Sequence, residues 1–129
     1  MTARVLVVED DTSIRGLLAT LLENEGHDVV TAEDGLAGLV AAGADVPDLV
    51  LLDLVMPDLG GRRVLEELRA DPRTADVPVI VVTGRPDEAA ALLPDVGAAD
   101  VVGKPFAVED LLGRVRAVLD AAGRAGGDA

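Results

Sequence analysis

Short apolar runs alternate along the chain with longer amphipathic stretches, and this alternation constrains the fold more than any other feature. The runs are continuous and mostly rich in β-branched residues, as expected for strands of a parallel sheet that is covered on both faces. They lie at Val5–Val8, Val29–Val30, Leu49–Leu52, Val79–Val82 and Val101–Val102. Strands that alternate in this way with helices predict an α/β doubly wound domain.

The stretches between the runs carry apolar side chains at helical spacing. Ile14, Leu17, Leu18, Leu21 and Leu22 lie at i, i+3, i+4, i+7 and i+8, which is one face of a helix. Capping preferences give further boundaries. The expected boundary residues are Thr12 or Ser13 and Gly26 for the first helix, Asp34 for the second, Asp71–Pro72 for the third and Pro86 for the fourth.

Length and composition indicate one globular domain. The chain has 129 residues, of which 50% are hydrophobic, and no apolar run is long enough to span a membrane. The absence of Cys excludes disulfides and thiolate metal sites, and it favours a cytoplasmic protein. We expect a domain over residues 1–120, followed at residues 121–129 by a flexible C-terminal tail or the stub of a linker.

The charge of the chain restricts its partners. The formal net charge is −13, so the surface should repel nucleic acid and anionic membranes. Phe106 is the only aromatic residue, which argues against recognition of bases by stacking. A cation, or a protein with a basic surface, is the better prediction.

Polar residues follow the predicted strands at the point where each strand ends. Glu9 and Asp10 follow the first strand, Asp53 the third, Thr83 the fourth and Lys104 the fifth. The carboxyl ends of parallel strands meet at one edge of a sheet, where ligands bind, so these side chains should converge. Three crowded carboxylates call for a cation, and an all-oxygen site suits Mg²⁺. The hydroxyl and the ammonium could hold phosphoryl oxygens, which points to phosphoryl transfer onto a carboxylate.

Four motifs carry a resemblance to a known family. They are VLVVEDD at 5–11, LVLLDLVMPDLGG at 49–61, VIVVTG at 79–84 and GAADVVGKPF at 97–106. In order and position they resemble the receiver domain of bacterial two-component response regulators, of the chemotaxis-regulator type. The resemblance covers about residues 3–120 and implies a flavodoxin-like, five-stranded parallel sheet with strand order 2-1-3-4-5.

The resemblance also implies a role for each residue of the metal site. Asp53 matches the aspartate that accepts a phosphoryl group from a phosphohistidine. Asp10 would contact Mg²⁺ directly, and Glu9 would act through a water molecule. Val55 matches the position whose backbone carbonyl completes the metal site.

Further roles follow from the same resemblance. Thr83 matches the hydroxyl that moves toward the phosphoryl group, and Lys104 matches the lysine that bridges it. The Lys104–Pro105 bond is expected to be cis. Val101 stands where many members have an aromatic residue that swings inward, so output is expected to run through Thr83 and the loop that leads into the fourth helix.

The resulting prediction is a phosphorylation-activated switch. The chain would catalyse only its own phosphorylation and slow dephosphorylation, and so would not be an enzyme in the ordinary sense. The expected partners are a histidine kinase or histidine phosphotransfer protein, and either a downstream protein or an effector domain outside this chain. We expect a monomer or a weak, activation-dependent dimer.

Other functions stay open at this stage. One is a receiver-like interaction domain that is never phosphorylated. Another is a Mg²⁺-dependent phosphatase of the haloacid dehalogenase type, which needs an aspartate where this chain has Val55. A third is a flavodoxin-type flavin module, but Glu9, Asp10 and Asp11 would repel the flavin phosphate.

Overall fold

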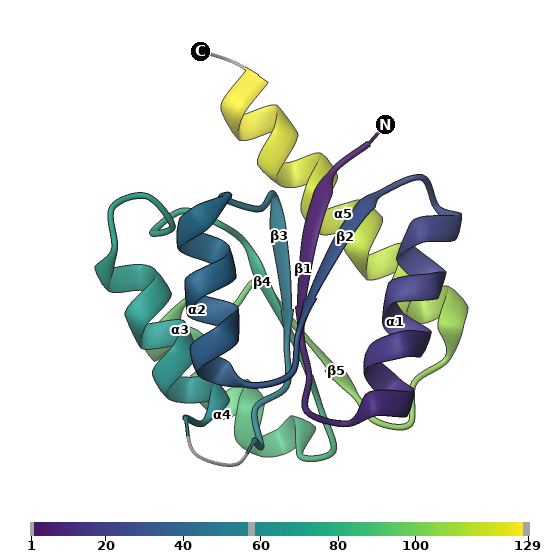
Figure 1. The fold of residues 1–129 in the computed structure, drawn as a ribbon, viewed down its shortest axis with the longest axis horizontal. Helices are drawn as coiled ribbons and strands as arrows, with labels where there is room; N and C mark the ends of the chain where they lie inside the picture. Colours follow the sequence, from purple (N-terminus) through teal and green to yellow (C-terminus); the bar gives the residue numbers. More distant parts are fainter. Residues whose placement is uncertain (1, 57–58, 128–129) are drawn as a thin grey trace.

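The chain forms one parallel sheet flanked by helices (Figure 1). The computed structural model describes residues 2–56 and 59–127, without the side chains of residues 92–96 and 124–127. The sheet has five strands in the order β2-β1-β3-β4-β5, and all pairs are parallel. This confirms the predicted fold class and strand order.

Strands and helices alternate along the whole chain. The strands are β1 (Arg4–Val8), β2 (Asp28–Ala32), β3 (Leu49–Leu52), β4 (Val79–Thr83) and β5 (Asp100–Gly103). The helices are α1 (Thr12–Asn24), α2 (Gly35–Ala44), α3 (Gly61–Ala70), α4 (Pro86–Val96) and α5 (Val108–Gly127). Each predicted apolar run lies within the corresponding strand.

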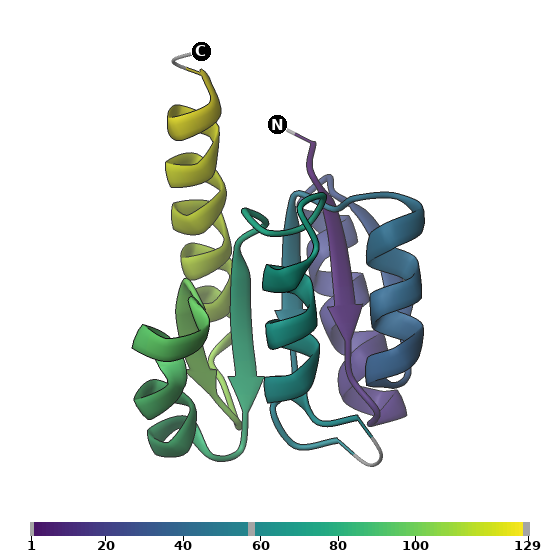
Figure 2. The same ribbon diagram turned by 90° about the vertical axis from the view of Figure 1, so that its left-hand side faces the viewer.

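Two apolar cores lie on opposite faces of the sheet. Successive side chains of a strand point to opposite faces, so Leu6 and Val8 of β1 pack with α2 and α3, whereas Val5 and Val7 pack with α1 and α5. Figure 1 shows α2 and α3 on one side of the sheet and α1 and α5 on the other, and Figure 2 looks onto the sheet from the α2 and α3 side. Burial on both faces explains why the central strands are apolar throughout.

The first helix has its N-cap one residue earlier than predicted. Asp11, not Thr12 or Ser13, is the N-cap, and its carboxylate accepts the Ile14 N–H at 2.9 Å. Three successive residues are good caps by type, and only the path of the chain after β1 selects among them. Gly26 follows the helix with φ of +92°, a conformation that favours glycine, so the predicted C-terminal signal is confirmed.

The last helix is longer than predicted. α5 continues to Gly127, so residues 121–127 are helical where the sequence suggested a flexible tail. Ala121, Ala122 and Ala125 favour helix, and they outweigh the glycines that prompted the expectation. Residues 128–129 of that predicted tail lie outside the described part of the chain.

Within residues 2–56 and 59–127, no helix is both long and apolar enough to cross a lipid bilayer.

Candidate functional site

The sheet topology places the predicted site residues at one end of the molecule. β1 pairs with β2 on one side and β3 on the other, so the helices that follow β1 and β3 leave toward opposite faces. Glu9 extends β1 by one bond, from its N–H to the Ala32 carbonyl at 3.1 Å. The Asp53 N–H donates to the Val8 carbonyl at 3.0 Å, which holds the two strand ends together.

Three carboxylates converge where β1 and β3 end. Glu9, Asp10 and Asp53 each offer an oxygen, and these oxygens lie within 4.8 Å of one another. Glu9 is 1% and Asp53 6% exposed, whereas Asp10 faces solvent. The all-oxygen donor set, one member open to water, suits a hard divalent cation that keeps part of its hydration shell, as Mg²⁺ does.

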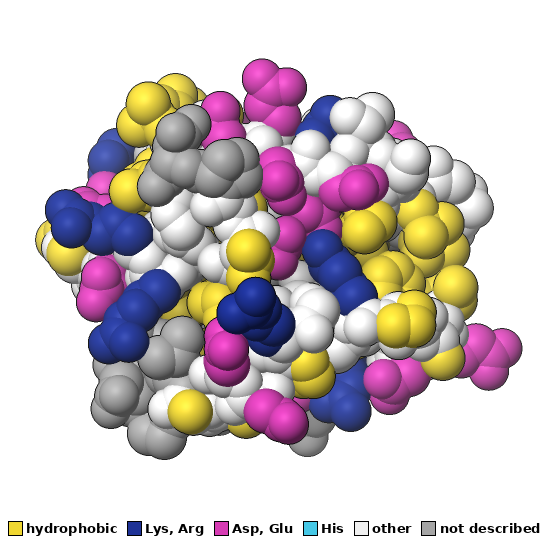
Figure 3. All heavy atoms as spheres, turned by 90° about the horizontal axis from the view of Figure 1, so that it is seen from below, with side chains coloured by type: hydrophobic (Ala, Val, Ile, Leu, Met, Phe, Trp, Pro, Cys, Tyr) yellow, Lys and Arg dark blue, Asp and Glu magenta, His cyan; other side chains and the backbone are white. Residues whose placement is uncertain are grey.

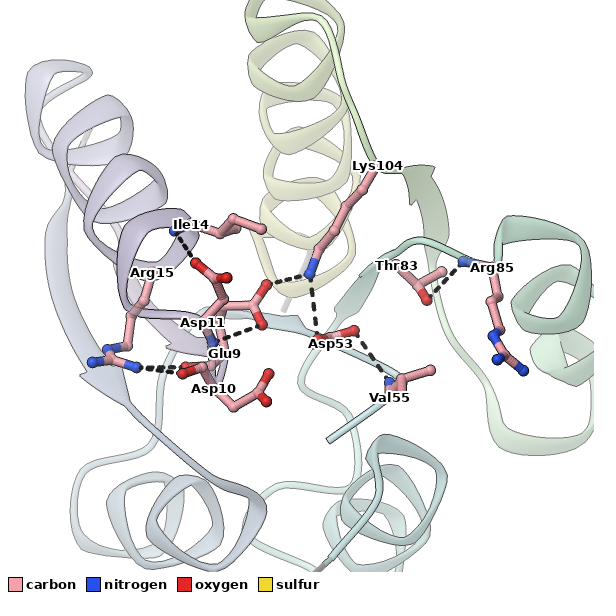
Figure 4. A network of polar contacts seen from close by, with 10 residues as sticks. All are labelled: Glu9, Asp10, Asp11, Ile14, Arg15, Asp53, Val55, Thr83, Arg85 and Lys104. Carbon is pink, nitrogen blue, oxygen red and sulfur yellow. Dashed lines mark hydrogen bonds and ion pairs between the residues drawn. The ribbon is translucent and has the colours of Figure 1, made fainter. Parts of the chain in front are cut away.

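Lys104 supplies positive charge to this cluster (Figure 4). Its Nζ donates a short hydrogen bond to Glu9 Oε1 and lies 3.3 Å from Asp53 Oδ2. Lys104 is delivered from the end of β5, where its N–H donates to the Thr83 carbonyl at 2.8 Å and its bond to Pro105 is cis, as expected.

The electrostatics of the cluster are unbalanced when only protein groups are present. Burial raises the pKa of the Glu9 carboxyl to about 7; the Lys104 hydrogen bond opposes this shift and the nearby Asp53 carboxylate adds to it. The pKa of Lys104 is raised: burial lowers it, but the bond to Glu9 and the charge of Asp53 outweigh that effect. One ammonium therefore does not fully compensate the buried carboxylates.

Two further predicted residues border the cluster. The Val55 N–H donates to Asp53 Oδ1 at 3.1 Å, and its side chain is 53% exposed. The Thr83 hydroxyl is fully buried and accepts the Arg85 N–H at 3.1 Å, so it is engaged by the loop into α4 and not by Asp53. Figure 4 shows Thr83 on the opposite side of Asp53 from Asp10.

The face around the site combines charge and apolar surface. Viewed from the carboxyl ends of the strands, acidic side chains gather at the centre of Figure 3, and apolar side chains lie beside them on the side of α1. Leu17 of α1 is 46% exposed and Val108 of α5 is 40% exposed.

Sequence reasoning missed two residues that shape the site. Arg15 of α1 donates to the backbone carbonyls of Glu9 and Asp10. Gly61, the first residue of α3, packs against the backbone of Asp53 and Leu54. The only sequence signal for Gly61 was its place in the Gly60–Gly61 pair that ends the motif at residues 49–61. Pro57 and Asp58 of the same motif lie outside the described residues.

Comparisons with known proteins decide the family. A profile of the response regulator receiver domain matches residues 5–116. The chain belongs to the response regulator receiver domain family. It is therefore a receiver domain of the kind found in two-component systems, a family that generally uses Mg²⁺, and the acidic cluster fits that metal.

Individual relatives agree with this assignment. The receiver domain is 43% identical over 119 residues to the DNA-binding dual master transcriptional regulator RpaA of Synechocystis sp., with 90% of this chain and 48% of RpaA aligned. It is 42% identical over 121 residues to response regulator MprA of Mycobacterium bovis, with 92% of this chain and 51% of MprA aligned. The chain thus spans about half the length of these curated relatives.

Solved structures match over nearly the whole chain. The chemotaxis protein CheY4 of Vibrio cholerae is 30% identical with a TM-score of 0.86, covering 92% of this chain and 99% of CheY4. A CheY-like receiver domain of Methanospirillum hungatei is 30% identical with a TM-score of 0.89, covering 96% and 98%.

Proposed function

We propose that the receiver domain is a phosphorylation-activated switch that accepts a phosphoryl group from a phosphohistidine onto Asp53. The observation that carries the proposal is the convergence of the Asp53 carboxylate with the oxygens of Glu9 and Asp10 and with Lys104 Nζ. In the reaction, an Asp53 oxygen attacks phosphorus and the phosphorus–nitrogen bond to histidine breaks. The product is an aspartyl phosphate.

The residues around Asp53 have separable roles in this step. Asp10 would hold Mg²⁺ directly, with Asp53 and the Val55 backbone carbonyl, and Glu9 would act through water; the bound ion would neutralise charge on the phosphoryl oxygens. Lys104 would move from Glu9 toward the phosphoryl group. The hydrogen bonds to Asp53 from Val55 and Lys104 hold the carboxylate in one orientation, which favours in-line attack.

Intact mass measurement tests the proposal. The domain is incubated with acetyl phosphate and Mg²⁺, with EDTA in place of Mg²⁺, and as the Asp53→Asn variant. We expect the mass of one phosphoryl group to appear only with Mg²⁺ and Asp53 present. No mass gain in any sample would favour the alternative of an interaction domain that is not phosphorylated, and a gain in Asp53→Asn would place the acceptor elsewhere.

The apolar side chain of Val55 leads us to expect a long lifetime of the phosphorylated state. This side chain is exposed beside Asp53 but has no polar atom with which to orient an attacking water molecule. The aspartyl phosphate should therefore hydrolyse more slowly in the wild type than in Val55→Asn. Decay followed by mass after removal of acetyl phosphate should show at least a few-fold faster loss in Val55→Asn, with Val55→Leu as the apolar control. Equal decay in all three would contradict the assignment.

The same position bears on the phosphatase alternative. A phosphatase of the haloacid dehalogenase type would need a general acid at residue 55, and the exposed valine cannot donate a proton. The switch is therefore the better supported reading of this aspartate.

Partners follow from the surface of the site. Figure 3 shows apolar side chains beside the acidic centre on the side of α1, and Leu17 of α1 and Val108 of α5 are exposed. This apolar surface would receive a helix of a histidine kinase or histidine phosphotransfer protein. Output would pass from Thr83 through Arg85 to α4, because the Thr83 hydroxyl is hydrogen-bonded to that loop. The effector would be a separate protein, or a further domain such as the one implied by the longer, DNA-binding relative RpaA.

Self-association would be weak. Arg114 of α5 pairs within the same chain with Asp100 at 2.8 Å and with Asp110 at 3.2 Å. A dimer through this surface would have to exchange these contacts for equivalent ones with a partner, and a net charge of −13 opposes association.

A further inference from the structure

Arg15 reaches back from the first turn of α1 to the loop that carries the acidic pair. One guanidinium nitrogen, Nη1, donates to the Glu9 carbonyl at 2.9 Å and to the Asp10 carbonyl at 3.3 Å (Figure 4). In the same view the Arg15 side chain lies on the far side of this loop from Asp53. Arg15 therefore contacts the backbone that holds the carboxylates and not the carboxylates themselves.

These two carbonyls stand where the chain leaves the sheet. The last sheet contact made by this strand is the Glu9 N–H bond to Ala32, and the next regular bond is the Arg15 N–H to the Asp11 carbonyl at 2.9 Å, at the start of α1. Between these two bonds, within the described part of the chain, the Arg15 side chain donates to the carbonyls of Glu9 and Asp10. Its side chain thus bridges the gap between strand and helix.

The carboxylate of Asp10 depends on this bridge more than that of Glu9. Glu9 is buried and is held through its side chain by Lys104 and by the Asp11 N–H at 3.4 Å. Asp10 is exposed, and in the described part of the chain no side-chain hydrogen bond fixes its carboxylate. Its direction toward Glu9 and Asp53 is set by its backbone, which Arg15 holds.

We propose that Arg15 is a positioning residue for the divalent cation: by holding the Glu9 and Asp10 carbonyls it directs the Asp10 carboxylate into the metal site. The inference rests on the proposed function, because it assumes that this cluster binds Mg²⁺. Residues outside the ligand shell that orient ligands in this way commonly change metal affinity by roughly 10- to 100-fold when they are replaced.

The charge of Arg15 makes the proposal easy to separate from a simple electrostatic effect. A guanidinium close to the site repels a cation, so loss of its charge alone would strengthen Mg²⁺ binding. Loss of the two hydrogen bonds would weaken it. The two effects have opposite signs in Arg15→Ala, and Arg15→Lys keeps the charge while losing the forked guanidinium geometry.

The test is a Mg²⁺ titration followed by amide NMR shifts of residues 9–11 and 53–55, which suits a chain without Trp or Tyr. We expect Arg15→Ala to bind Mg²⁺ roughly 10-fold more weakly than wild type, and Arg15→Lys to be intermediate. Arg116→Ala is the matched control, since it removes the same charge from α5, where Arg116 forms an ion pair with Glu25 at the end of α1, and it should change affinity less than about two-fold.

Each result bears on one of the two proposals. Unchanged or tighter binding by Arg15→Ala would overturn the role of Arg15 while leaving the proposed function intact. Absence of saturable shifts in the wild type would overturn the metal site itself. If the amide spectrum shows that Arg15→Ala is unfolded, Arg15→Lys decides: affinity equal to wild type would overturn the proposal, and weaker binding would support it.

Discussion

Gly61→Ala is expected to destabilise the domain by about 1–3 kcal/mol and to impair the proposed phosphorylation of Asp53. A Cβ atom at Gly61 would lie 2.3 Å from the Asp53 carbonyl oxygen and 2.7 Å from the Leu54 Cα. Both are backbone atoms, so no side-chain rotation relieves the clash. Either α3 shifts away from the sheet, or the segment that carries Asp53 moves.

The displacement would reach the site because the first residue of α3 packs against the segment that carries Asp53. The Gly61 N–H donates to the Leu54 carbonyl at 3.0 Å, so the first turn of the helix and the turn after Asp53 form one packed unit. A small shift of Asp53 separates its carboxylate from the Glu9 and Asp10 oxygens. We therefore expect slower phosphorylation by acetyl phosphate even under conditions in which the variant is fully folded.

Urea unfolding gives the measurement, with Gly16→Ala as the matched control. Gly16 lies within α1, is exposed, and a Cβ there would meet no heavy atom within 4 Å. That substitution should stabilise the domain by about 0.5–1 kcal/mol, since alanine favours a helix interior. If Gly61→Ala unfolds at the wild-type urea concentration, the close packing of α3 against the Asp53 segment is wrong.

The fold was largely predictable because its main signals are local. A continuous β-branched run such as Val79–Val82 is apolar on both faces of its strand. Both faces are buried when the strand lies inside a sheet that is covered on both sides, so the run predicts that arrangement. The sequence located β2 and β5 correctly but predicted them to be shorter than they are. Both are edge strands that are only partly buried, so they carry polar residues at their ends, and these residues interrupt the apolar pattern. The strand order came from the family resemblance, because apolar pattern alone does not order strands.

Some features of the site were likewise predictable from the sequence, and others were not. The convergence of Glu9, Asp10, Asp53 and Lys104 was predictable because strand ends converge in any parallel sheet of this kind. Their roles, and that of Thr83, stay predictions. Arg15 was not predictable, because a long side chain that returns to backbone carbonyls leaves no trace in residue type or spacing. The contact between Gly61 and the Asp53 backbone was equally hidden, because it depends on the angle at which α3 approaches the sheet.

The pH dependence of stability is the second large expected effect, and it follows from Glu9. The folded state raises the pKa of this carboxyl from 4.5 to about 7, chiefly through burial. A raised pKa means that the folded state binds the proton more tightly than the unfolded chain. The stabilisation from Glu9 protonation is therefore complete below pH 4.5 and is lost as the pH rises to about 7.

Glu9→Gln removes this titration while keeping a side chain of the same shape that can accept the hydrogen bond from Lys104. Without Mg²⁺, the free energy of unfolding of wild type minus that of Glu9→Gln should fall by on the order of 3 kcal/mol between about pH 5 and pH 8. The difference between variants is the useful quantity, because exposed carboxylates such as Asp71, whose pKa is lowered by Arg73, titrate alike in both.

Mg²⁺ should reverse the trend. At about pH 8 the ionised Glu9 carboxylate is available to the cation or its water shell, so saturating Mg²⁺ should stabilise wild type by mass action more than it stabilises Glu9→Gln. Urea unfolding at several pH values, with Mg²⁺ and with EDTA, supplies both comparisons. A difference between the variants that stays flat across this pH range would show that Glu9 is ionised in the folded state throughout, and that Lys104 alone compensates its charge.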